Sequence, residues 1–138
     1  MKTVYPTIFT DTGEGFLVEI PDLDILTQGT DMENAIEMAR DAISITIVSL
    51  EDNKQEVHAP SAMECIDASK GNFADDGKSF VSMVDVDTAE YRRKIDTKPV
   101  RRNVSLPSWL NHEVNEAGIN VSRFLQDALV EKLNIQPR

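Results

Sequence analysis

The spacing of apolar and polar residues predicts a β-rich group of elements near the N-terminus. Residues 4–10 and 16–20 are rich in β-branched and aromatic side chains, a composition typical of strands. The Asp- and Gly-containing residues 11–15 predict a turn between them, so the two strands should form a hairpin. Pro21 interrupts the second strand, and a short third strand is predicted over residues 25–28.

Helical spacing follows the third strand. The sequence Thr30-Asp31-Met32-Glu33 matches a capping box, in which Thr30 caps the helix and Glu33 reaches back to it. Apolar residues then keep helical spacing for about five turns, at Met32, Ala35, Ile36, Ala39, Ile43, Ile47 and Leu50. Another capping-box match at Ser61-Ala62-Met63-Glu64 predicts one short helical turn, and residues 79–86 return as a strand. The front half is therefore predicted to be β-β-β-α-β.

Residues 100–106 predict a strand of a different kind, because apolar and polar side chains alternate along it. Its apolar face carries Val104 and Leu106. The opposite face carries a cation, an amide and a hydroxyl, with no carboxylate, from Arg101, Asn103 and Ser105.

Two helices are predicted to follow this strand. Pro107 fits the first helical position, since its missing N–H would have no partner there. Gly118 suits a left-handed cap at the end of that helix, and Asn120 suits the N-cap of the next one. The second helix carries one apolar stripe, made of Val121, Phe124, Leu125, Ala128, Leu129 and Leu133.

A tail this short lacks the core to offset its own ordering entropy unless it associates. Two copies would solve this by joining their strands into an antiparallel ribbon, with four helices closing over it. The residues predicted for this dimer core are Val104, Leu106, Trp109, Phe124 and Leu125. The outer face of such a ribbon fits the DNA major groove, where Arg bonds guanine and Asn bonds adenine.

The pattern RRNVSLPSWL…GINVSRFL, within residues 100–135, resembles ribbon-helix-helix DNA-binding domains. The resemblance implies that Arg101, Asn103 and Ser105 read bases. It also implies that backbone N–H groups at Asn120 and Val121 hold a phosphate, and helix N-termini favour anions on independent grounds. The alternative interpretation of the same polar face is a solvated strand edge.

Charge is divided unevenly along the chain, whose net charge of −10 argues against a uniform nucleic-acid binder. Residues 1–90 hold 19 Asp and Glu against 5 Lys and Arg, and residues 91–138 hold 5 against 9. The tail can therefore approach phosphate, while the front should attract a basic surface. We predict a front domain at 1–94, a linker at 95–99 and a tail domain at 100–138.

The front half resembles the N-terminal domain of HicB antitoxins, through YPTIF at 5–9, GFLVEIPDL at 15–23 and TQGT at 27–30. With its tail, the whole chain is similar to the HicB of a HicA–HicB toxin–antitoxin pair. The resemblance implies an α+β fold, with a partial ribonuclease-H-like β-β-β-α-β domain before a ribbon-helix-helix (β-α-α) dimerisation domain.

The same resemblance implies a function and two partners. The front domain would inhibit a HicA-type toxin, a small basic ribonuclease that cleaves mRNA. The tail would repress the protein's own operon by binding operator DNA. The acidic residues that we expect to meet the toxin are Asp11, Glu14, Asp22 and Asp24.

Two other functions use the same residues. Carboxylates of the hairpin region, with Glu19 among them, could converge on metal ions in a nuclease, but turn chemistry explains most of them. We therefore expect no enzyme, metal or cofactor. The second alternative is a stand-alone ribbon-helix-helix repressor whose front domain senses a small ligand.

Cellular location and assembly are also predicted. A single cysteine, Cys65, excludes an internal disulfide and fits a reducing compartment. No apolar run suits a signal peptide or a membrane span, so we expect a cytoplasmic protein. It should be a homodimer through the tail, and a tetramer if front domains also pair.

Overall fold

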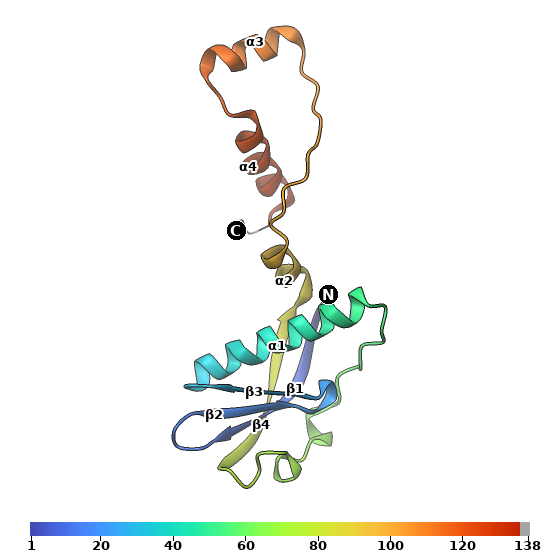
Figure 1. Cartoon of the computed structure of the whole chain (residues 1–138), viewed down its shortest axis with the longest axis vertical. Coiled ribbons are helices and arrows are strands. Elements are labelled where there is room, and N and C mark those ends of the chain that lie inside the picture. Colours follow the sequence, from blue (N-terminus) through green and yellow to red (C-terminus); the bar gives the residue numbers. More distant parts are fainter. Residues whose placement is uncertain (136–138) are drawn as a thin grey trace. The chain divides into compact units, whose positions relative to one another are not determined.

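The computed structural model describes residues 1–135, and its chain divides into two compact units, Met1–Asp96 and Thr97–Arg138. The last three residues of the predicted tail domain lie outside the described part. Figure 1 shows an α+β architecture, which confirms the predicted class. Its helices and strands are β1 (Lys2–Asp11), β2 (Phe16–Ile20), β3 (Ile25–Gly29), α1 (Met32–Asp52), β4 (Lys78–Asp87), α2 (Thr88–Ile95), α3 (Ser108–Ala117) and α4 (Val121–Leu133).

The first unit is built on one antiparallel sheet with the order β3-β2-β1-β4. β1 pairs with β4 along its whole length, from Lys2 opposite Asp87 to Asp11 opposite Lys78. β1 is central, and six consecutive residues, 5–10, are buried on its two faces. The predicted β-β-β-α-β order is therefore confirmed.

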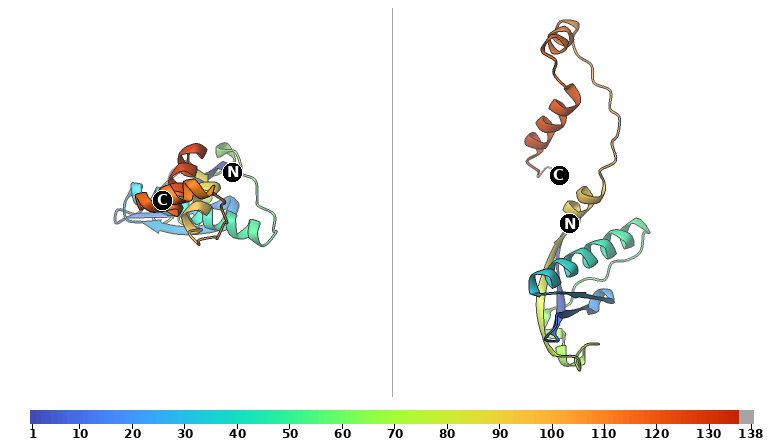
Figure 2. Two further views of the ribbon diagram at one scale, coloured as in Figure 1. Left: turned by 90° about the horizontal axis from the view of Figure 1, so that it is seen from above. Right: turned by 60° about the vertical axis from the view of Figure 1, so that its left-hand side comes forward.

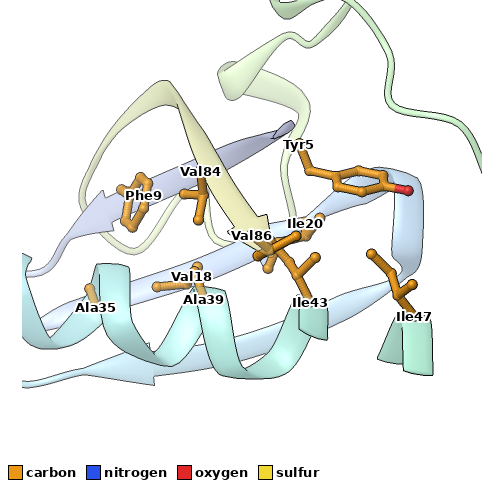
Figure 3. Packing of buried hydrophobic residues seen from close by; sticks show 10 residues of the cluster. All are labelled: Tyr5, Phe9, Val18, Ile20, Ala35, Ala39, Ile43, Ile47, Val84 and Val86. Carbon is orange, nitrogen blue, oxygen red and sulfur yellow. The ribbon is translucent and has the colours of Figure 1, made fainter. Parts of the chain in front are cut away.

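Helix α1 covers one face of this sheet (Figures 1 and 2). Its apolar side packs against side chains that alternate along the strands, because residues two apart share a face of a sheet. Each such side chain contributes about 1.5–3 kcal/mol when fully buried. Figure 3 shows this core, formed by Tyr5, Phe9, Val18, Ile20, Ala35, Ala39, Ile43, Ile47, Val84 and Val86.

The irregular segment between α1 and β4, residues 53–77, contacts the other face of the sheet. Gly71 lies so close to β1 that an added Cβ would be 3.1 Å from Cδ1 of Ile8. Glu19 of β2 holds the next residue, since its carboxylate accepts hydrogen bonds from the Asn72 backbone N–H (2.8 Å) and side-chain amide (2.9 Å). This segment thus helps to bury Ile8, which is 3% exposed.

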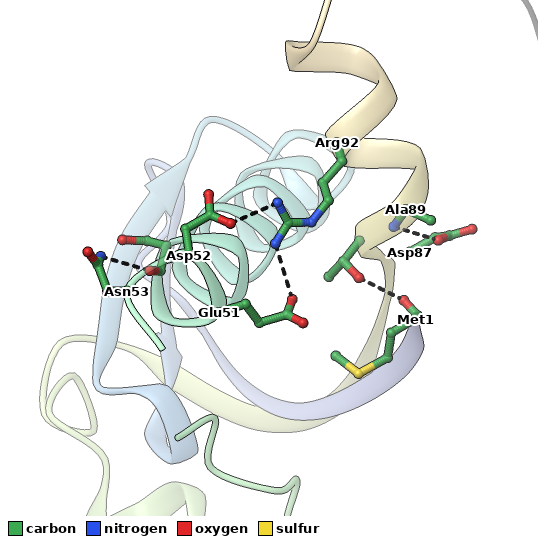
Figure 4. A network of polar contacts seen from close by, with 9 residues as sticks. Met1, Glu51, Asp52, Asn53, Asp87, Ala89 and Arg92 are labelled. Carbon is green, nitrogen blue, oxygen red and sulfur yellow. Dashed lines mark hydrogen bonds and ion pairs between the residues drawn. The ribbon is translucent and has the colours of Figure 1, made fainter. Parts of the chain in front are cut away.

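Helix α2 was not predicted, because half of its eight residues are charged. Asp87 caps it by accepting hydrogen bonds from two backbone N–H groups of the first turn. Arg92 then pairs with Asp52 (3.0 Å) and Glu51 (3.7 Å) at the end of α1 (Figure 4). Carboxylates are unfavourable beside the negative C-terminal end of a helix dipole, so Arg92 offsets their charge and links α2 to the end of α1.

Both predicted capping boxes are wrong. The N-cap of α1 is Asp31, whose carboxylate accepts from the Asn34 N–H at 2.8 Å, and the Thr30 N–H donates back to the Asn34 side chain. The box therefore lies one residue later than predicted. At the second match, the short turn η2 (Met63–Cys65) has no side-chain cap, because Ser61 bonds to Asp22 instead.

The second unit contains both predicted helices with the predicted caps. Gly118 ends α3 in the left-handed region at φ 68°, and the Asn120 side chain caps α4 by accepting from the Arg123 N–H at 3.1 Å. Pro107 stands one position before the first helical residue, at the N-cap of α3. Residues 100–106 form no strand in the single chain, because no partner strand for them exists among residues 1–135.

Candidate interaction surfaces

The second unit contains a hollow of about 280 Å³ lined by apolar side chains alone. The lining residues are Val104, Leu106, Leu110, Val114, Ile119, Val121, Phe124 and Leu125. Four of the five residues predicted for the dimer core are among them. The fifth, Trp109, is 69% exposed and lies outside the lining.

Large apolar side chains of this unit are open to solvent. Phe124 is 68% exposed, Leu133 64% and Val104 51%. Single exposed apolar residues are ordinary on a soluble protein, but a contiguous group around a hollow indicates an interaction site.

The polar residues predicted to read bases are all exposed in the same unit, at Arg101, Asn103 and Ser105. The Asn120 side chain is engaged by its cap, so only backbone groups at the start of α4 are available to an anion. The first N–H groups of a helix have no acceptor within it, and Val121 is 37% exposed there.

The four acidic residues predicted to meet a toxin do not form one cluster. Asp11 ends β1 and Glu14 lies within the β1–β2 turn, where the Asp11 carboxylate accepts from the Gly13 N–H at 2.9 Å. Asp22 and Asp24 follow the other end of β2, in and after the 3-10 turn η1 (Pro21–Leu23). Glu14 and Asp24 are exposed, and Asp24 adopts a left-handed φ of 58°.

Asp22 has a local role in the first unit. Its side chain is only 7% exposed and accepts from the Ser61 N–H (2.8 Å) and Oγ–H (2.7 Å). The nearby Tyr5 hydroxyl donates to the His58 carbonyl at 2.6 Å. Burial, and secondarily the Asp22 charge, raise the pKa of Tyr5 above its ordinary value. These contacts join β1 and η1 to the irregular segment.

A charged groove of about 850 Å³ in the first unit was missed from the sequence. It lies between α1, α2 and the paired ends of β1 and β4. Arg40 and Asp85 both line it and form an ion pair at 2.8 Å. The Arg40 guanidinium holds the pKa of Asp85 below its usual range. Glu37 and Asp41 line the groove four residues apart on α1, a spacing that places them on one helix face and could have indicated it.

No candidate metal centre is found within residues 1–135, where no three His, Cys, Asp or Glu side chains gather suitably. Cys65, the single cysteine, is exposed. None of the helices described here has the length and apolar content needed to cross a membrane.

Comparisons with known proteins place the chain in a family. A family model described as "HicB_like antitoxin of bacterial toxin-antitoxin system" matches residues 5–128. A solved "Toxin-Antitoxin complex from Streptococcus pneumoniae" contains a chain 30% identical to this one, with a TM-score of 0.60, covering 96% of this chain and 99% of that one. No significant match was found among curated proteins.

Two further solved structures are similar. The antitoxin HicB of Burkholderia pseudomallei is 27% identical, with a TM-score of 0.50, over 96% of this chain and 97% of that one. An antitoxin HicB3 structure is 23% identical and shares the fold, with a TM-score of 0.50, over 98% of this chain and 100% of that one. The chain therefore belongs to the HicB-like antitoxins of bacterial toxin–antitoxin systems.

Proposed function

We propose that this chain neutralises a small basic ribonuclease of HicA type through its first unit and represses its own operon through its second. The first unit would be a partial ribonuclease-H-like domain, and the second a ribbon-helix-helix. The DNA-binding part rests on the apolar hollow and on residues 100–106 beside it, which have no strand partner among residues 1–135. The polar face of these residues, the reading face, carries Arg101, Asn103 and Ser105. Antitoxins are non-enzymatic regulators, so the nuclease interpretation is set aside.

A second copy of the chain accounts for both features of the C-terminal unit. Residues 100–106 lack a strand partner, and the backbone groups of a strand need one. The same residues in a second copy supply it as an antiparallel ribbon. The exposed apolar side chains around the hollow, with Trp109, then become the core between two copies.

The ribbon would present two sets of reading residues to DNA. A two-stranded ribbon fits the major groove. Arg101, Asn103 and Ser105 of each copy would contact base edges, and the start of α4, at Asn120 and Val121, would hold a phosphate. None of the three reading side chains is an acid that would repel the DNA.

The first unit suits a basic protein partner. Residues 1–96 hold 20 Asp and Glu against 8 Lys and Arg, which favours association with a positively charged surface. The toxin would meet exposed carboxylates near the hairpin, with Glu14 and Asp24 better placed than Asp11 and Asp22, whose side chains are engaged within the unit. The toxin–antitoxin complex of a 30% identical chain supports a toxin as the partner.

The toxin part is tested by purifying the full chain with the product of the neighbouring reading frame. We expect a stable complex on gel filtration, and RNA cleavage by the neighbouring protein should stop when the antitoxin is added in equimolar amount. If the two proteins do not associate but the promoter is still bound, the stand-alone repressor is the correct interpretation.

The DNA part is tested with the promoter of the same operon. Arg101→Ala or Asn103→Ala should weaken binding by about 1–3 kcal/mol and relax base preference at the positions that they contact. Lys54→Ala serves as a control, because it removes an exposed charge from the first unit. Fluorescence anisotropy with promoter and scrambled duplexes measures both effects, and equal losses on the two duplexes would contradict base reading.

A further inference from the structure

We propose that a basic segment, residues 93–102, binds the DNA phosphates that flank the reading face, and this inference rests on the proposed DNA binding. The segment holds five of the chain's 14 Lys and Arg and a single acid, Asp96. Its cations are Arg93, Lys94, Lys98, Arg101 and Arg102. Of these, only Arg101 has been given a role in reading bases.

Folding does not use most of these charges. All five side chains are exposed, and none has an acidic partner within 4 Å in the described part of the chain. Arg92, one residue earlier, differs because it pairs with two carboxylates of α1. Arg93 and Lys94 stabilise the C-terminal end of the α2 dipole, but Lys98 and Arg102 lie outside any helix, so another reason is needed for them.

The length of the chain allows a phosphate contact. Lys98 stands three residues before Arg101, a span of at most about 10 Å when extended. The major groove is about 12 Å wide, so a strand on its midline lies roughly 6 Å from the phosphates on either side. When Arg101 reaches a base edge, Lys98 is therefore within reach of the groove rim. Arg102 shares the strand face of Val104 and Leu106, so its side chain does not point at the bases that Arg101 would read, and the test below leaves it unchanged.

The charge of the whole chain explains why such a segment is useful. A dimer of chains with net charge −10 repels DNA. Phosphate contacts release condensed counterions, which makes the affinity for DNA fall as salt rises, by a slope of about 0.9 per contact. A local group of cations beside the reading face can supply these contacts without contributing sequence preference.

The test compares two double variants that remove equal charge. Lys94→Gln with Lys98→Gln changes the basic segment. Lys54→Gln with Lys70→Gln changes two exposed lysines of the first unit that lie outside the segment. The full chain is titrated against a duplex of about 30 base pairs, roughly three helical turns, from its own promoter at several KCl concentrations. Circular dichroism verifies that both variants are folded.

We expect the segment variant to lower the slope of log K against log salt by about 3–4, because a dimer loses four lysines. The control variant should keep the wild-type slope. Equal slopes in the two variants would overturn the role of the basic segment while leaving base reading intact. Absence of wild-type binding to the promoter at every salt concentration would overturn the proposed DNA binding and this inference with it.

Discussion

Among single residues, Asp22 differs most from its predicted role, because it was expected to meet a toxin and instead bonds within the first unit. Its nearly buried carboxylate accepts two hydrogen bonds from Ser61. Asp22→Asn would replace a charged acceptor of both hydrogen bonds by a neutral amide, which can accept only one of them. We expect the free energy of unfolding to fall by about 1–2 kcal/mol, because hydrogen bonds to charged groups are worth more than those to neutral groups. Urea unfolding followed by circular dichroism measures this change in the free energy of unfolding.

Asp24→Asn is the matched control for this prediction. Asp24 is exposed and left-handed, and Asn tolerates that backbone conformation, so stability should change by less than about 0.5 kcal/mol. Equal losses in both variants would contradict the role of Asp22. The sequence could not reveal this role, because Ser61 is 39 residues away in an irregular segment whose path depends on tertiary packing.

Tyr5 predicts how stability depends on alkaline pH. Burial raises its pKa, with a smaller effect from Asp22, so the folded state holds the phenolic proton more tightly than the unfolded chain. This contribution is complete below the unfolded pKa of about 10 and is lost as pH rises through the folded value. Urea unfolding from about pH 8 to about pH 11, a range that includes this pKa, measures the effect. The free energy of unfolding should fall more steeply with rising pH for wild type than for Tyr5→Phe. Parallel pH profiles of the two proteins would contradict this role of Tyr5.

At the scale of elements, those with a clear local signal were predicted, and the prediction and the structure differ where an element depends on a distant partner. The strands from β1 to β4 and helices α1, α3 and α4 follow from periodicity and caps. Helix α2 was missed because its stability depends on Arg92 meeting the carboxylates of α1. The strand at 100–106 was predicted but is absent from the single chain, where its partner would be another molecule.

The apolar face of α4 gives the prediction at this scale. Phe124 lines the hollow and is 68% exposed in the single chain, so the proposed dimer should bury it. Phe124→Ala should then weaken dimerisation by roughly 3–5 kcal/mol, the usual loss for a buried phenylalanine. Light scattering over a concentration series measures the monomer–dimer equilibrium. Gln126→Ala, an exposed position on the same helix, should leave it unchanged, and a wild-type monomer would contradict the prediction.

At the scale of the whole molecule, the two units divide charge between two partners. Residues 97–138 hold 6 Lys and Arg against 4 Asp and Glu, whereas the first unit is strongly acidic. Composition alone predicted this division, but not which carboxylates are free. Asp11, Asp22, Asp85 and Asp87 are engaged in turns, caps and ion pairs, so the charge available to a partner comes from other acids.

The association of the first unit with a toxin should therefore depend on ionic strength. Charge steering raises association rates at low salt and fades as the Debye length shrinks from about 10 Å at 0.1 M to 3 Å at 1 M. Between those concentrations we expect the on-rate to fall by about tenfold or more, with a smaller change in the off-rate. Stopped-flow mixing of the full chain with the neighbouring gene product measures both rates. An on-rate that does not respond to salt would show that the toxin recognises shape or apolar surface, and that the acidity of this unit serves another purpose.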